Sequence, residues 1–70
     1  MGKEKETKLA EKRKAKNWTQ QQLAEESGVA VRSIRAYEQG SKEINKAQAI
    51  SVYNLAKALE CEVKDLLELD

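Results

Sequence analysis

The sequence predicts an all-α domain, a compact bundle of five short helices, from three observations. The chain has no proline and only three glycines among 70 residues, and good helix formers such as alanine, leucine, glutamate and lysine dominate it. Apolar residues recur with a helical period, most clearly over residues 45–59, and no sustained two-residue alternation indicates a strand. The length allows one domain, which we assign to residues 7–70, preceded by a disordered charged arm at residues 1–6.

The first two helices are predicted on either side of Asn17. Residues 7–16 form the first helix, and Asn17 can end it in the left-handed conformation. The segment T-Q-Q-Q that follows is a capping box, in which the Thr19 hydroxyl accepts from the amide of Gln22 and the Gln22 side chain accepts from the amide of Thr19. The second helix therefore begins at Thr19, and it ends just before Gly28, which can supply the positive φ of a sharp turn.

The third helix is predicted over about residues 30–39, and its two sides differ in character. Ile34, Tyr37 and Ala30 lie together on the side that we expect to be buried. The opposite side carries Arg32, Arg35, Ala36 and Gln39. Because no acidic residue is among them, this side is suited to a nucleic-acid groove.

The second half of the chain predicts two further helices. Gly40 ends the third helix, residues 41–44 form a polar loop, and Asn45 caps a fourth helix that runs to Leu59. The buried stripe of that helix is predicted to be Ala49, Val52, Tyr53, Ala56 and Leu59. A short fifth helix is predicted within residues 63–67.

Composition argues against several classes of protein. No apolar run approaches the roughly 20 residues that span a bilayer, so we expect a cytoplasmic protein without a membrane segment. With one cysteine and no histidine, the chain has no internal disulfide, no Cys/His zinc set and no imidazole to act as a general base near neutral pH. We therefore expect neither an enzyme nor a protein with a metal or another cofactor.

The net charge of +1 hides an uneven distribution of charge. Residues 1–16 carry seven Lys and Arg against three Glu, residues 17–46 carry four against four, and residues 47–70 carry two against five acidic residues. A chain with a basic and an acidic end is a candidate polyanion binder that presents one face to its partner. Charge alone does not separate this interpretation from ordinary solvated helix surfaces.

Residues 19–40, T-Q-Q-Q-L-A-E-E-S-G-V-A-V-R-S-I-R-A-Y-E-Q-G, resemble the helix-turn-helix of the phage repressor and Cro-like family, also called XRE-type. The apolar positions at which the two helices pack are matched by Leu23, Val29, Ile34 and Tyr37. The segments L-A-K-A-L and V-K-D-L-L resemble the last two helices of the family's five-helix, lambda-repressor-like bundle, so the resemblance covers about residues 7–68. The sequence departs from the pattern in four ways. Ala30 replaces the usual Ser or Thr cap, Ser27 replaces a common apolar residue, Lys12 replaces a frequent leucine, and the loop between the third and fourth helices is about three residues longer than usual.

The resemblance implies a sequence-specific protein for double-stranded DNA that inserts its third helix in the major groove. Val31, Arg32 and Ala36 match base-reading positions, and an arginine can bind O6 and N7 of guanine together. Gln20 matches a DNA-contacting glutamine at a helix N-terminus, where the amides also favour a phosphate. The full set that we expect at the DNA, including the phosphate-gripping residues after the third helix, is Thr19, Gln20, Val31, Arg32, Ser33, Arg35, Ala36, Lys42, Asn45 and Lys46.

The resemblance also implies a structural salt bridge between Arg13 and Glu38, which tie the first helix to the end of the third. We expect a homodimer, at least on DNA, because one short recognition helix reads too few base pairs for useful specificity. Leu66, Leu67 and Leu69 are the candidate dimer surface.

The function that we infer from the sequence is a transcriptional regulator of repressor type, which occupies an operator and is nucleoid-associated when bound. The alternative is an antitoxin-like or other protein-binding module that uses the same fold and holds a protein partner through its acidic C-terminal face.

Overall fold

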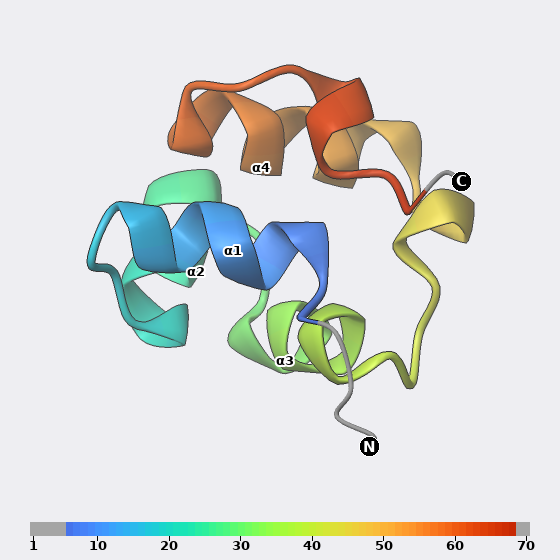
Figure 1. Cartoon of the computed structure of the whole chain (residues 1–70), viewed down its shortest axis with the longest axis horizontal. Helices are drawn as coiled ribbons and strands as arrows, with labels where there is room; N and C mark the ends of the chain where they lie inside the picture. The colour runs from blue at the N-terminus through green and yellow to red at the C-terminus, as the bar shows by residue number, and fades with distance from the viewer. Residues whose placement is uncertain (1–5, 69–70) are drawn as a thin grey trace.

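The computed structural model describes residues 6–68, and these form a bundle of four α-helices with two 3-10 turns (Figure 1). The elements are α1 (Lys8–Ala15), α2 (Gln20–Ser27), α3 (Val31–Gln39), the turn η1 (Ile44–Lys46), α4 (Ala49–Leu59) and the turn η2 (Val63–Asp65). No strand occurs in the described part, so the all-helical prediction is confirmed. The predicted charged arm, apart from Glu6, lies outside the described residues.

The described helices are too short and too polar for any of them to cross a membrane. In Figure 1, α4 lies on one side of the bundle and α3 on the other, with α1 and α2 between them. One apolar core joins all four helices and both turns. Its buried members are Leu9, Leu23, Val29, Ile34, Ile44, Val52, Leu55, Ala56, Leu59 and Leu66.

Left-handed residues end the helices where the sequence predicts sharp turns. Asn17 follows α1 with φ 60°, Gly28 follows α2 with φ 77° and Gly40 follows α3 with φ 84°. A positive φ is unstrained for glycine and tolerated by asparagine, so these residues stop each helix without loss of packing. The chain can therefore reverse direction between short helices.

The prediction that Asn45 caps the fourth helix is wrong. Ile44, placed by the sequence in a polar loop, is only 5% exposed and turns into the core through η1. The chain needs this extra turn to bury Ile44, so α4 begins later, at Ala49. Gln48 occupies the N-cap position of α4 and makes no side-chain capping hydrogen bond there.

The buried side of α4 also differs from the predicted stripe. Val52, Leu55, Ala56 and Leu59 are buried, which is an i, i+3, i+4, i+7 pattern. Ala49 is exposed and Tyr53 is 52% exposed, whereas Leu55, expected at the border of the stripe, is fully buried. The helix is thus rotated so that four aliphatic side chains enter the core while Tyr53 stays half exposed.

The predicted fifth helix is reduced to the single turn η2, so the described chain has four α-helices rather than five. The amide of Glu62 donates to Asp65 Oδ2 at 3.0 Å and the Glu62 side chain accepts from the backbone of Asp65, which closes the turn. Leu66 follows with no exposed surface. One turn therefore suffices to return the chain to the core, and Leu66 cannot belong to a dimer surface. Leu67 is half-buried and Leu69 lies outside the described residues.

Candidate nucleic-acid interface

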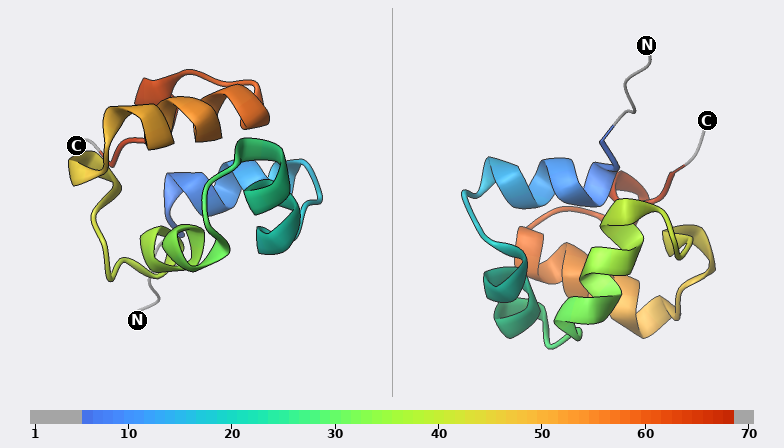
Figure 2. Two further views of the ribbon diagram at one scale, coloured as in Figure 1. Left: turned by 180° about the vertical axis from the view of Figure 1, so that it is seen from behind. Right: turned by 90° about the horizontal axis from the view of Figure 1, so that it is seen from below.

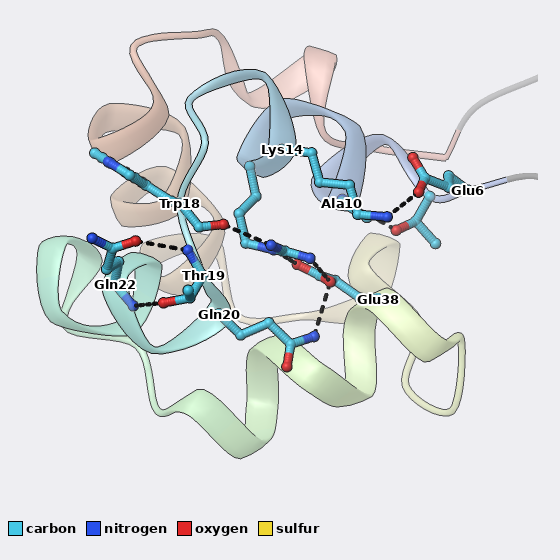
Figure 3. A network of polar contacts seen from close by, with 10 residues as sticks. Glu6, Ala10, Lys14, Trp18, Thr19, Gln20, Gln22 and Glu38 are labelled. Atoms are coloured by element: carbon cyan, nitrogen blue, oxygen red, sulfur yellow. Dashed lines mark hydrogen bonds and ion pairs between the residues drawn. The ribbon is translucent and has the colours of Figure 1, made fainter.

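The start of α2 is fixed by the capping box that the sequence predicts (Figure 3). The amide of Gln22 donates to Thr19 Oγ1 at 3.0 Å, and the amide of Thr19 donates to Gln22 Oε1 at 2.8 Å. The Thr19 hydroxyl is therefore occupied as an acceptor within the protein. Because the box uses the amides of positions 19 and 22, it leaves those of Gln20 and Gln21 at the open end of the helix.

A buried ion pair supports the same helix end from α1 and α3. Arg13 Nε lies 2.7 Å from Glu38 Oε2 and Arg13 Nη2 lies 3.0 Å from Glu38 Oε1, which is the bidentate pairing expected between these two residues. Arg13 Nη1 also donates to the carbonyl of Trp18 at 2.7 Å. Only 12% of the arginine and 7% of the glutamate side chain are exposed, so the pair joins α1, α3 and the approach to α2 while largely shielded from solvent.

Both members of this pair are charged at neutral pH. The hydrogen bond from Arg13 to Glu38 raises the pKa of the guanidinium despite its burial. Burial alone raises the pKa of the Glu38 carboxyl, but the hydrogen bonds from Arg13 and Gln20 outweigh it and hold the pKa below its usual 4.5.

The Gln20 side chain is oriented by this network. Its Nε2 donates to Glu38 Oε1 at 2.9 Å, and Figure 3 shows its oxygen directed away from Glu38. The free oxygen is an acceptor, which suits a base amino group rather than a phosphate. Phosphate binding at this end of α2 would therefore fall to the backbone amides of Gln20 and Gln21.

The turn between α2 and α3 depends on Ser27, a role that the sequence did not suggest. Its hydroxyl donates to the carbonyl of Leu23 at 2.7 Å and accepts from the amide of Val29 at 3.1 Å. Ser27 is only 8% exposed, so both bonds lie in the interior. In contrast, Ala30 at the N-cap of α3 makes no side-chain hydrogen bond. The only signal for Ser27 in the sequence is its departure from the apolar residue common at this position.

The outer side of α3 has the composition expected from the sequence. Ile34 is fully buried and Tyr37 packs against the core, which turns Arg32, Arg35 and Gln39 into solvent. Val31, Ser33 and Ala36 are half-buried beside them. Ala30, expected on the buried side, is exposed because it precedes the first helical turn.

A groove separates α3 from the loop at residues 41–48. It encloses about 450 Å³, with Ser33 and Tyr37 on the α3 side and Lys42 and Lys46 on the loop side. Both lysines are exposed, and Lys46 Nζ is 3.8 Å from a Glu43 carboxylate oxygen in an exposed contact of little energetic weight. Seen from below in Figure 2, α2, α3 and this loop lie side by side on one face of the molecule.

Asn45, expected at the DNA, instead has both ends of its carboxamide engaged by Glu68. Asn45 Nδ2 donates to the Glu68 carbonyl at 3.1 Å, and the Glu68 amide donates to Asn45 Oδ1 at 2.8 Å. The structure thus brings together the residues expected from α2, α3 and the two loop lysines, and it sets Asn45 apart in a contact with the C-terminal segment.

Groups that could carry other chemistry do not gather elsewhere in the described chain. Within residues 6–68, no three His, Cys, Asp or Glu side chains are grouped so that they could hold a metal ion. Cys61 is half-buried, and burial raises the pKa of its thiol. The raised pKa favours the protonated thiol at neutral pH, and the thiol is a weaker nucleophile than the thiolate.

A comparison with protein-family models identifies residues 9–66 as a helix-turn-helix. The match begins at the second residue of α1 and ends at Leu66, so it covers nearly all of the described fold. Comparisons with curated proteins and with solved structures gave no significant match.

Proposed function

The chain belongs to the XRE-type helix-turn-helix family of DNA-binding transcriptional regulators, and on this premise we propose that it is a repressor that binds a specific operator in double-stranded DNA. The observation that carries the proposal is the outer side of α3, where Arg32, Arg35 and Gln39 are exposed with no acidic side chain among them. Repression would follow from occupation of a promoter in the cytoplasm.

Base recognition is assigned to α3 in the major groove. The Arg32 guanidinium can donate to O6 and N7 of one guanine, and the small side chains of Val31 and Ala36 suit contact with a thymine methyl group. Ser33 and Arg35 lie beside these base-reading residues, and each can reach either a base edge or the DNA backbone. Arg32 is therefore the residue on which sequence preference should depend most.

Phosphate binding is assigned to both flanks of α3. On one side, the start of α2 offers the amides of Gln20 and Gln21 and the positive end of the helix dipole. On the other side, Lys42 and Lys46 line the groove between α3 and the following loop. Contacts of this kind fix the register of the protein but do not distinguish sequences.

The operator is proposed to be a two-fold site bound by two copies of the chain. A recognition helix of nine residues contacts only a few base pairs, and a second half-site one helical turn away supplies the remaining specificity. Since Leu66 is buried, the contact between the copies must use other side chains.

The test is selection of bound duplexes from a random pool, followed by binding measurements with variants across a salt series. Arg32→Ala should weaken binding to the preferred duplex by about 1–3 kcal/mol and binding to random DNA much less. Lys46→Ala should weaken both duplexes alike and lower the salt dependence by about one charge per subunit. Lys57→Ala is the matched control, because Lys57 is exposed on α4, on the side of the bundle opposite α3.

One result would contradict the proposal directly. If Arg32→Ala leaves the ratio of preferred to random affinity unchanged, α3 does not read bases. The antitoxin-like, protein-binding interpretation would then become the better one.

A further inference from the structure

The loop at residues 41–48 is joined to the C-terminal segment by a pair of reciprocal hydrogen bonds. The Asn45 carboxamide accepts from the Glu68 amide at 2.8 Å and donates to the Glu68 carbonyl at 3.1 Å, across 23 residues of sequence. Figure 1 shows the end of the described chain lying beside η1. A carboxamide whose oxygen and nitrogen are both bonded to the backbone of one residue has a fixed orientation, so the backbone at Asn45 is held as well.

The two lysines of the loop depend on this contact to different degrees. Lys42 is tied to α3 through its amide, which donates to the Ala36 carbonyl at 3.2 Å. Lys46 is adjacent to Asn45, and its amide donates only within the turn, to Glu43 at 3.0 Å. Besides the buried Ile44 and Ala47, which packs against the core, the Asn45 contact is thus the polar link between the Lys46 side of the loop and the rest of the domain.

Glu68 is itself anchored at a second point. Its carboxylate accepts from the amide of Lys8 in the first turn of α1 at 2.6 Å. An acceptor at this place satisfies a helix amide that has no partner within the helix, and its negative charge complements the helix dipole. Glu68, whose backbone binds Asn45, is therefore also bonded to α1 and does not move freely with the loop.

We propose that Asn45 is a positioning residue for Lys46: the Asn45–Glu68 clamp holds the loop so that the Lys46 ammonium meets a DNA phosphate. The inference rests on the proposed function, and it assigns to the C-terminal segment a part in DNA affinity without any contact to DNA. It also replaces the expected direct role of Asn45 at the DNA.

The salt dependence of binding to a random duplex distinguishes positioning from direct contact. Asn45 is uncharged, so a lost hydrogen bond from its side chain to a phosphate would lower affinity without changing the salt slope. If Asn45 acts through Lys46, Asn45→Ala should lower the slope by up to about one charge per subunit, as Lys46→Ala does. Combined with Lys46→Ala it should have little further effect, whereas with Lys42→Ala its effect should add.

Two substitutions at Glu68 test the clamp from its other side. Glu68→Pro removes the amide that donates to Asn45 and should reproduce the reduced slope of Asn45→Ala. Glu68→Ala keeps that amide and removes only the anchor to α1, so its slope should lie between those of the wild type and Glu68→Pro. Thermal unfolding of each variant identifies the temperature range in which all of them are folded, and binding is compared within that range.

The outcomes separate this inference from the proposed function. If Asn45→Ala keeps the salt dependence of the wild type, or if its effect adds to that of Lys46→Ala, Asn45 does not position Lys46. The preference for one operator sequence would be unaffected by that result. Equal binding of the wild type to every duplex would instead overturn sequence-specific recognition, and the slope measurement on random DNA would still decide the role of Asn45.

Discussion

The two helices of the helix-turn-helix begin in opposite ways. The start of α2 is surrounded by side-chain hydrogen bonds: the Thr19–Gln22 capping box, Arg13 on the carbonyl of Trp18, and Gln20 on Glu38. The start of α3 has no side-chain cap. One helix is therefore fixed at its first turn, and the other must be fixed elsewhere along its length.

The difference shows how the domain places a helix whose first turn has no side-chain cap. α3 is held by the buried Ile34 in its middle and by Glu38 near its end, while Ser27 and Val29 hold the turn before it. The N-cap residue Ala30 has no polar side chain that could bond the amides of the first turn of α3. The helix is thus positioned by contacts on its buried side, and its first turn on the solvent side carries no side-chain cap.

The largest expected effect comes from the ion pair that supports both helices. Arg13→Ala or Glu38→Ala should each lower the free energy of unfolding by about 3–5 kcal/mol, because either change leaves a buried charge without its partner. The double variant should lose much less than the sum of the two, as measured by denaturant unfolding in a double-mutant cycle. Additive losses would show that the two charges do not interact in solution.

The next effect tests how the turn before α3 is held. Ser27→Ala should lower the free energy of unfolding by about 1–3 kcal/mol, because the buried amide of Val29 loses its acceptor. Ser41→Ala is the control: its hydroxyl donates to the Ala36 carbonyl at 3.3 Å in an exposed position, so its loss should change stability by no more than about 0.5 kcal/mol. Equal effects of the two substitutions would argue against a structural role for the buried serine.

Substitutions at the two N-cap residues, Thr19 and Ala30, test the difference between the starts of α2 and α3. Thr19→Ala should destabilise the fold by about 1 kcal/mol, and Ala30→Ser should stabilise it by a similar amount, since the Ala30 backbone, at φ −58° and ψ 140°, is non-helical as a cap residue requires. The doubly exchanged variant should unfold close to the wild-type midpoint. If Ala30→Ser gives no gain, the first turn of α3 is already satisfied by water or by the backbone.

The smallest effect is expected at acidic pH, in the dependence of the unfolding free energy on pH. The folded pKa of Glu38 lies below its usual 4.5, because the hydrogen bonds from Arg13 and Gln20 outweigh burial. The stability that this ionised carboxylate supplies is complete above the unfolded pKa and is lost as the pH falls through the folded pKa. Glu38→Gln should flatten that decline in unfolding free energy, whereas the exposed Glu26→Gln should not.

Features that depend on a few neighbouring residues are predicted well from the sequence. The capping box at Thr19, the left-handed residues Asn17, Gly28 and Gly40, and the exposed arginines of α3 all follow from local spacing and from the conformational preferences of single residues. The Arg13–Glu38 pair is distant in sequence, and it came from the family resemblance rather than from periodicity.

Features set by tertiary contacts were missed. Ser27 and Asn45 are polar residues whose partners are backbone groups, and no pattern in the sequence marks a backbone partner. The fifth helix was overestimated because Val63 and Leu66 fit a helical period, although one turn is enough to bury Leu66. Because its neighbours are polar, the sequence predicts Ile44 in a loop. In the structure its side chain enters the core.

Trp18 gives the molecule an optical probe at an informative place. It is the only tryptophan in the chain, and its half-buried ring packs against the core with the Lys16 ammonium 5.2 Å from the ring centroid. Its carbonyl is the one that Arg13 holds at the entrance to α2. Intrinsic fluorescence should therefore follow unfolding without a label, and a polyanion that draws Lys16 away from the indole should change the emission while the fold stays intact.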